Sequence, residues 1–111
     1  MNTHPQTGRK LRSAERAIIA ALAPTAAAGL GDALVVDMRD GGMGSIRFLN
    51  GGDRRRSRSI AEAEYVDVDG VLVSIELNID QTNQLFELDF WKVDFSPLRH
   101  YPDPRDLKSL K

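Results

Sequence analysis

Apolar and polar residues alternate through most of the second half of the chain, which is the period of a strand with one buried face. The alternation is clearest between Glu64 and Pro97, where two turn sequences interrupt it, Asp69-Gly70 and residues 80–83. Asp-Gly is typical of a two-residue type I′ turn, because both residues tolerate the left-handed conformation. The pattern predicts three consecutive antiparallel strands, at residues 60–68, at residues 71–79 and after the loop at residues 80–83.

Side-chain parity decides which residues of the last hairpin share a face, because a slip of one residue would turn every side chain over. With residues 80–83 as the loop, the core face carries only apolar pairs: Val73 with Phe90, Ile75 with Leu88, and Leu77 with Phe86. The opposite face carries these pairs: Leu72 with Trp91, Ser74 with Asp89, and Glu76 with Glu87. The uniformly apolar core pairs favour this register.

The strand at residues 60–68 fits less well. A two-residue turn at Asp69-Gly70 places Tyr65 on the acidic surface, but it directs Glu62 and Glu64 toward the core. A β-bulge near Val66 would return both glutamates to the outside.

Two strands are predicted upstream, at residues 34–39 and 44–48, around a glycine-containing loop at residues 40–42. Their apolar positions give the following pairs: Val36 with Ile46, and Leu34 with Phe48. Residues 50–59 are a polar connector whose four arginines repel one another, so we expect this connector to be exposed and mobile.

A helix is predicted before the strands, with Ser13 as its N-cap, Glu15 in its first turn and Pro24 at its end. Its apolar stripe has helical spacing and consists of Leu11, Ala14, Ile18 and Leu22. Residues 24–32 are compatible with a loop or with a short second helix.

Together these elements predict an α+β fold, in which one N-terminal helix packs on a twisted antiparallel meander of about five strands. The chain of 111 residues is long enough for one core. We expect a flexible tail at residues 1–10, a single domain at residues 11–102 and a C-terminal tail at residues 103–111.

Composition narrows the classes of function. The absence of cysteine excludes disulfides, thiolate metal sites and cysteine nucleophiles, and it fits a cytoplasmic protein. Residues 9–28 resemble a signal peptide, but Glu15 and Arg16 interrupt them and the apolar run is short. No segment approaches the about 20 apolar residues that span a membrane, so no membrane association is expected.

Three segments of the chain resemble the recurrent blocks of a family of small, mostly bacterial proteins of unknown function. The segments are DMRDGGMGSIRF (Asp37–Phe48), YVDVDGVLVSIELNID (Tyr65–Asp80) and LFELDFWKVDFSPL (Leu85–Leu98). The resemblance extends from Leu11 to Pro102 and implies a shared fold and a bacterial origin. It implies no activity and no catalytic residue.

The strongest candidate site is the acidic cluster of Glu76, Glu87 and Asp89, beside Ser74 and Asn78. Its borders are aromatic and apolar: Tyr65, Leu72 and Trp91. Facing like charges are destabilising and require a cation. That cation is Arg47 or Arg39 of this chain, a partner's basic side chain, or a divalent metal ion. A solvated face with its own arginines explains the acids, whereas a tryptophan on a polar face indicates a contact patch.

Other motifs have simpler explanations. The loop at residues 40–45 lacks the spacing of a phosphate-binding loop, and residues 67–70 lack the first acid of a calcium loop, because Tyr65 stands there. The basic run at residues 54–58 has no aromatic neighbours, so nucleic-acid binding is not expected, although the run could dock on the acidic face of a second copy. The histidines, His4 and His100, lie in or near the terminal segments, where catalytic geometry is hard to hold.

These observations favour a non-enzymatic protein that binds a basic partner, comparable in class to bacterial immunity proteins. The predicted binding residues are Tyr65, Leu72, Ser74, Glu76, Glu87, Asp89 and Trp91. We assign no catalytic residue, metal ligand or cofactor. Two alternatives remain: a small carboxylate- or metal-dependent hydrolase that uses the same acids, and a homo-oligomeric structural protein that associates through Trp91 and Phe95.

Overall fold

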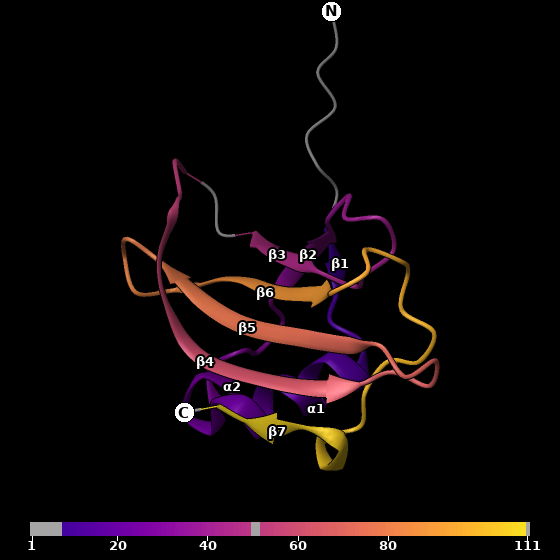
Figure 1. Ribbon diagram of the computed structural model, residues 1–111. Coiled ribbons are helices and arrows are strands. Elements are labelled where there is room, and N and C mark those ends of the chain that lie inside the picture. The colour runs from indigo at the N-terminus through magenta and orange to yellow at the C-terminus, as the bar shows by residue number, and fades with distance from the viewer. Residues whose placement is uncertain (1–7, 50–51, 111) are drawn as a thin grey trace, which may run out of the picture.

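The computed structural model describes residues 8–49 and 52–110, which form an α+β fold around one antiparallel sheet (Figure 1). In chain order the elements are β1 (Arg9–Lys10), α1 (Ser13–Leu22), α2 (Pro24–Ala28), β2 (Leu34–Asp37), β3 (Ile46–Leu49), β4 (Arg56–Val66), β5 (Leu72–Asp80), β6 (Leu85–Lys92), the 3₁₀ helix η1 (Pro104–Asp106) and β7 (Lys108–Ser109). The described residues therefore form seven strands, where the alternation pattern predicted about five.

The strand order is β1-β2-β3-β6-β5-β4-β7, and all neighbours are antiparallel. The predicted meander is wrong, because β3 pairs with β6 and not with β4. The chain leaves β3, crosses to the far side of the β4–β5–β6 unit and returns strand by strand, which is a Greek-key connection. Figure 1 shows the long, curved β4 and β5 in front, with β3 beyond β6.

The two edge strands of the sheet are each only two residues long. β1 pairs with β2 through Arg9 and Lys10, and β7 pairs with β4 through Lys108 and Ser109. These residues belong to the segments for which the sequence predicts tails, so part of each segment contributes to the sheet. A two-residue edge strand presents few unpaired backbone groups, which limits edge-to-edge association.

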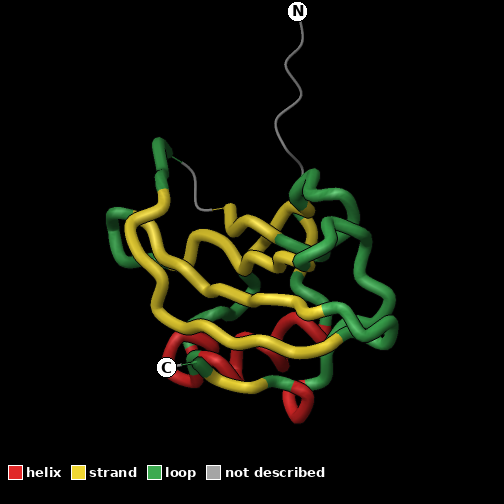
Figure 2. The backbone as a smooth tube through the Cα atoms, in the orientation of Figure 1, coloured by secondary structure: helices red, strands yellow, loops and turns green. Residues whose placement is uncertain are grey.

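The helices lie together on one side of the sheet (Figure 2). α1 forms as predicted, and Pro24 ends it and begins α2, which resolves the open choice for residues 24–32 in favour of a helix. The N-cap is Arg12 rather than Ser13. Of the predicted apolar stripe, Leu11 and Ile18 are buried, Leu22 packs against the core, and only Ala14 is exposed. α1 also buries Ile19. Among the described residues, no helix combines the length and apolar character needed to cross a membrane.

The loop between β2 and β3 is longer than predicted, and as a result the side chains of β2 face the opposite sides of the sheet from those predicted. Met38 N–H donates to the Ser45 carbonyl at 3.0 Å, and Asp37 rather than Val36 lies opposite Ile46. Val35 is consequently fully buried, whereas Leu34 is 42% exposed. The Asp40 carboxylate holds this loop by accepting from the backbone N–H groups of Met43 and Ser45.

The turn between β4 and β5 has three residues, not two. The Asp67 N–H donates to the Val71 carbonyl at 2.9 Å, the Gly70 N–H donates to the Asp67 carbonyl at 2.8 Å, and Gly70 has a φ of +81°. This is a type I turn followed by a glycine bulge. The extra residue shifts β4 by one position, so that Glu62 and Glu64 point outward without a bulge near Val66.

Two successive irregularities set the register of β5 and β6. The loop is residues 81–83, with Asn83 at a φ of +68°, so the pairing moves by one residue from the predicted one. A bulge that includes Phe86 moves it by one more. Because the register shifts by one residue twice, each side chain of β5 and β6 lies on its predicted face but opposite a different partner. Ile75, for example, lies opposite Phe90.

Candidate functional site

The outer face is the face of the sheet opposite the helices, and most of the predicted binding residues lie on it. Across β5 and β6 the observed pairs are Ser74 with Trp91, Glu76 with Asp89, and Asn78 with Glu87. Leu72 is half-buried at the end of β5, opposite Val66. The structure therefore brings the predicted acids and Trp91 onto one surface, although with different neighbours.

Tyr65 is not on this surface, and its predicted placement is wrong. The glycine bulge at Gly70 turns Tyr65 into the core, where it is 4% exposed and pairs with Val73. Its hydroxyl donates to the His100 carbonyl at 3.0 Å, which fastens the C-terminal segment to the sheet. Tyr65 is therefore a packing residue.

A row of three carboxylates crosses the outer face. Glu62 on β4 lies opposite Glu76 on β5, and Glu76 lies opposite Asp89 on β6. Cross-strand neighbours are close enough for like charges to repel. The sequence analysis did not place Glu62 on this face, because it predicted a two-residue turn between β4 and β5. The turn has three residues, and the third one moves Glu62 to the outer face. Alternation of Glu62 and Glu64 with the buried Ala61, Ala63 and Tyr65 was the signal that could have found it.

Arginines of the same chain neutralise part of this face. Arg47 Nε donates to Glu87 Oε2 at 2.7 Å, and an Arg56 guanidinium nitrogen lies 3.1 Å from Glu76 Oε1. Arg47 was one of the two intramolecular cations anticipated, whereas Arg39 makes no ion pair with these acids in the described part of the chain. Glu76 and Glu87 therefore have arginine partners within the chain.

Asp89 is the acid of the row that is partly buried and has no positively charged side chain of the described residues paired with it. It is half-buried, and Asn78 Nδ2 donates to its Oδ2 at 2.8 Å. Burial and then the neighbouring charge of Glu87 raise the pKa of Asp89 from its usual 3.8 to about 7. Within residues 8–49 and 52–110, no lysine or arginine forms an ion pair with it. A cation brought to this carboxylate would favour its charged form.

Two exposed aromatic residues stand beside Asp89. Trp91 is 53% exposed and Phe95 is 67% exposed, and their ring centres are 6.1 Å apart in a tilted contact. Phe95 adopts a φ of +63°, which is uncommon for a bulky residue. Exposed neighbouring aromatics on an otherwise polar face are typical of contact patches.

A groove of about 320 Å³ runs beside Trp91 and is called the outer groove below. Its lining combines acids with apolar side chains and consists of Glu62, Ala63, Ser74, Ile75, Glu76, Asp89, Trp91 and Leu110. Leu110 reaches the groove because its backbone N–H donates to the Glu62 carbonyl at 3.0 Å, just beyond β7. The C-terminal segment therefore forms one wall.

The basic run pairs within the chain. Arg54 has a side chain only 10% exposed, and its Nε donates to Asp80 Oδ2 at 2.7 Å. Its other nitrogens donate to the carbonyls of Phe48 and Leu85. The prediction of an exposed connector is therefore wrong for Arg54, whereas residues 56–58 are exposed as predicted but belong to β4. Asn50 and Gly51 lie outside the described residues.

Phe86 shows how the arginines cover the sheet. It is buried, but it lies outside the main core, with the guanidinium carbons of Arg47 and Arg54 at 5.1 and 5.2 Å from its ring centre. Predicted as a core partner of Leu77, it is instead the bulged residue of β6, held between two cations.

A second buried ion cluster contains Lys92, which the sequence analysis passed over. Its side chain is fully buried, and Nζ lies 2.9 Å from Asp67 Oδ2, 2.6 Å from Asp69 Oδ2 and 3.1 Å from the Pro97 carbonyl oxygen. The burial of Lys92 could have been predicted from the alternation of side chains along β6, because Lys92 is on the same face as the core residues Leu88 and Phe90. The residues of the suspected calcium loop are therefore engaged with an internal ammonium group.

Catalytic chemistry has few candidates. His100 is exposed and lies 4.0 Å from Asp106, and His4 is outside the described residues. In the described part of the chain, no group of three or more His, Cys, Asp or Glu side chains is arranged to hold a metal ion.

The pKa of Asp89 makes a testable prediction about stability. A carboxyl whose pKa is raised in the folded state binds more protons when folded, so its contribution to stability is complete below pH 3.8 and is lost as the pH rises through about 7. We expect Asp89→Asn to stabilise the protein at pH 8 by about 1 kcal/mol, a figure reduced for solvent screening. At pH 5 the gain should disappear.

Thermal unfolding followed by circular dichroism at both pH values measures this difference. The matched control is Glu64→Gln, which removes one charge from the same face outside the outer groove and should show the same offset at both pH values. A stabilisation by Asp89→Asn that is equal at pH 5 and pH 8 contradicts the assignment.

Comparison with known proteins identifies the family. Residues 8–102 match the family described as Domain of unknown function (DUF6984). No curated protein and no solved structure matches the chain. Since the match includes both helices, strands β1 to β6 and most of the outer face, the chain belongs to this family, whose function is unknown.

Proposed function

We propose that this protein is a non-enzymatic binding protein whose outer groove receives a lysine or arginine side chain of a basic partner protein. The observation that carries the proposal is the position of Asp89, a half-buried carboxylate without an ion-pair partner among the described residues, next to the exposed Trp91. A basic side chain would place its charge at Asp89 and its apolar stem or guanidinium plane against the indole.

The charges around the groove support a basic partner. Asp89 is at the end of the carboxylate row, next to Glu76, whose nearest described arginine nitrogen, from Arg56, is 3.1 Å away. Bringing a cation to this row relieves repulsion that the folded protein carries by itself. The exposed Phe95 beside Trp91 extends the contact area with an aromatic residue, the type enriched at the centres of interfaces.

The other two interpretations have less support. A carboxylate-dependent hydrolase needs a site that excludes water, whereas these acids line a groove on an open sheet face. Self-association through Trp91 and Phe95 would use the exposed aromatic pair but does not account for the carboxylate row beside Trp91. Docking of the basic run on the acidic face of a second copy would compete with the internal Arg54–Asp80 and Arg56–Glu76 pairs. An immunity-like role in a bacterial cytoplasm is part of this proposal. The small size and the acidic face support the role, the resemblance of the three sequence blocks supports the bacterial origin, and the absence of cysteine supports the cytoplasm.

Trp91 is the single tryptophan, so its fluorescence reports directly on the proposed site. We expect a hexapeptide of alternating arginine and glycine to change Trp91 emission, and the matching glutamate–glycine peptide to leave it unchanged. Binding should weaken with added salt, as it does for exposed charges. Asp89→Asn should weaken the binding about fivefold, which corresponds to about 1 kcal/mol for one partly exposed charge contact.

Glu64→Gln serves as the control, because it removes a charge of the same sign from the same face without altering the groove. Trp91→Leu, followed by NMR because it lacks the fluorophore, should weaken binding to a similar extent. An equal response to the acidic peptide, or an affinity that Asp89→Asn leaves unchanged, would overturn the proposal.

A further inference from the structure

A second cavity lies on the helix side of the sheet and shares no residue with the outer groove. This helix pocket has a volume of about 510 Å³. One wall comes from α2 and the segment that follows it: Thr25, Ala26, Gly29, Leu30 and Ala33. The other wall comes from the strands and the β5–β6 loop: Phe48, Ile60, Ile79, Asn83, Gln84 and Leu85.

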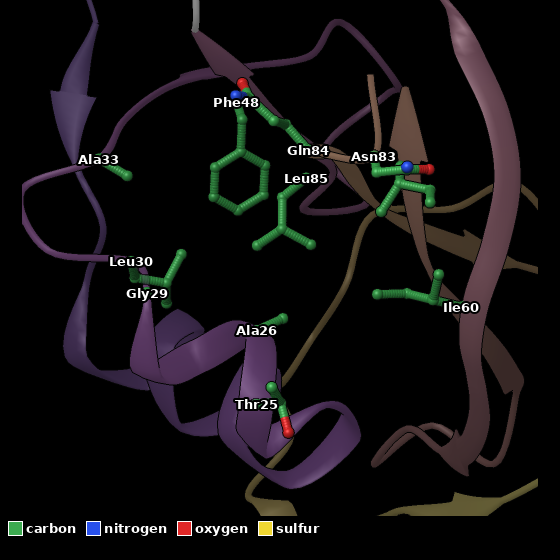
Figure 3. A pocket seen from close by; sticks show the side chains of 11 residues that line it. Thr25, Ala26, Gly29, Leu30, Ala33, Phe48, Ile60, Asn83, Gln84 and Leu85 are labelled. Carbon is green, nitrogen blue, oxygen red and sulfur yellow. The ribbon is translucent and has the colours of Figure 1, made fainter. Parts of the chain in front are cut away.

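The pocket exists because one wall is made mostly of small residues. Figure 3 shows the side chains of Phe48, Leu85 and Ile60 projecting from the strands toward the space beside Ala26. The residue of α2 that faces them carries only a methyl group, and Gly29 carries no side chain. A Cβ added at Gly29 would have only the Ala26 carbonyl oxygen within 4 Å, at 3.8 Å. Protein interiors are normally packed without such space.

The chemistry of the lining restricts what the pocket can hold. Its floor is apolar, formed by buried side chains such as Leu30, Phe48 and Ile79. Its polar side chains, those of Thr25, Asn83 and Gln84, are all uncharged, and within the described part of the chain no Asp, Glu, Lys or Arg lines it. A charged ligand would lose hydration here without gaining a counter-ion. A neutral ligand is therefore favoured.

The backbone at Asn83 is held in place at the rim of the pocket. Asn83 adopts a φ of +68° in the β5–β6 loop, where its N–H donates to the Asp80 carbonyl at 3.1 Å. The loop is in turn held by the Asp80 carboxylate, which accepts from the Thr82 N–H at 2.7 Å and the Gln84 N–H at 3.1 Å. The backbone that carries the Asn83 side chain is therefore fixed at the mouth of the cavity, where a polar group can orient a small ligand.

We propose that the helix pocket binds a small, electrically neutral molecule with an aromatic or compact aliphatic body and one hydrogen-bonding group. The volume lies within the about 300 to 1,000 Å³ of small-molecule sites. The apolar body contacts Phe48, Leu85 and Ile60, and the hydrogen-bonding group faces the rim at Asn83. This inference is independent of the function proposed for the outer groove.

Two dyes with the same aromatic body test the proposal. N-phenyl-1-naphthylamine is neutral and has one N–H donor, whereas 1-anilinonaphthalene-8-sulfonate carries the same rings with a negative charge. We expect the neutral dye to bind one molecule per chain with an increase in fluorescence. The anionic dye should bind at least tenfold more weakly.

Ala26→Leu fills the pocket from α2 and should weaken binding of the neutral dye at least tenfold. Ala33→Leu fills it from the segment before β2 and provides a second variant in case the first one unfolds; the thermal transition identifies folded variants. The matched control is Ala28→Leu, which adds the same side chain at an exposed position of α2 that does not line the pocket and should change the affinity less than twofold.

Four results would overturn the proposal: no binding of the neutral dye, equal binding of the two dyes, affinity unchanged in both folded filling variants, or a dimer in sedimentation that is lost in both filling variants. The last result would show that a second copy occupies the pocket.

Discussion

Replacing Lys92 with methionine is expected to lower the Tm by about 15 °C or more, the largest effect of any single substitution considered for this protein. The side chain is fully buried, and its ammonium group contacts two carboxylates, those of Asp67 and Asp69. Removal of the cation leaves the Asp67 carboxylate buried and without its counter-ion, which costs far more than the ion pair itself contributes. Circular dichroism during heating at pH 7 measures the change.

The same cluster predicts acid sensitivity. Burial by itself raises the pKa of Asp67, but hydrogen bonds from the Arg99 N–H, from Lys92 and from the Val68 N–H outweigh burial and lower the pKa to about 2. A group with a lowered folded pKa contributes stability above its unfolded value of 3.8, and this contribution is lost as the pH falls toward 2. The Tm of the unmodified protein should therefore fall steeply between pH 4 and pH 2.

The control for Lys92→Met is the double variant Lys92→Met with Asp67→Asn. It removes the uncompensated charge and should recover part of the lost Tm, because the neutral amide leaves no buried charge and its single oxygen can still accept from one of the two N–H groups, that of Arg99 or that of Val68. If the single variant melts within a few degrees of the unmodified protein, the cluster does not have the role that its burial indicates.

Replacing Asp80 with alanine is expected to destabilise the protein by about 3 kcal/mol. The carboxylate is fully buried and accepts from the N–H and hydroxyl of Thr82, from the Gln84 N–H and from Arg54 Nε. It therefore holds the β5–β6 loop and the guanidinium that joins β3 to β6. Urea unfolding at pH 7 gives the free energy of unfolding.

Arg54→Met tests the other half of this pair. We expect it to be destabilising by a similar amount, and we expect Asp80→Ala with Arg54→Met to cost less than the sum of the two single changes, because the two groups interact directly. Arg58→Met is the matched control from the same basic run; its side chain is exposed, and the change should stay within about 0.5 kcal/mol. Equal effects of Arg54→Met and Arg58→Met would contradict the assignment of Arg54 as the structural arginine.

Local sequence pattern was sufficient for several features of the fold. The helix at α1, the existence of the five longer strands and the exposure of Trp91 all follow from periodicity, which depends only on neighbouring residues. The acids Glu76, Glu87 and Asp89 were also placed on the correct face. Their face was predicted correctly only because two irregularities compensate for each other. The three-residue loop and the bulge at Phe86 each shift the register by one residue, and together they leave the face of each side chain unchanged.

Other features could not be read from the pattern, because they depend on a single inserted residue or on distant contacts. The third residue of the turn at Gly70 moved Tyr65 into the core and Glu62 onto the outer face. Turn length is set by the backbone conformation of one or two residues, and Asp-Gly is compatible with either length. A register error of one residue then changes the face of a whole strand.

The sequence by itself determined where the chain forms strands and helices and that acids and an indole gather on one side of a hairpin, because these properties depend on spacing along a few residues. Only the tertiary structure decided that β6 pairs with β3, that Arg54 pairs with Asp80 and Arg47 with Glu87, and that Lys92 is enclosed by Asp67 and Asp69. Strand order and ion pairing join residues that are many positions apart, and the free energy that selects them comes from burial of the whole sheet rather than from any local preference.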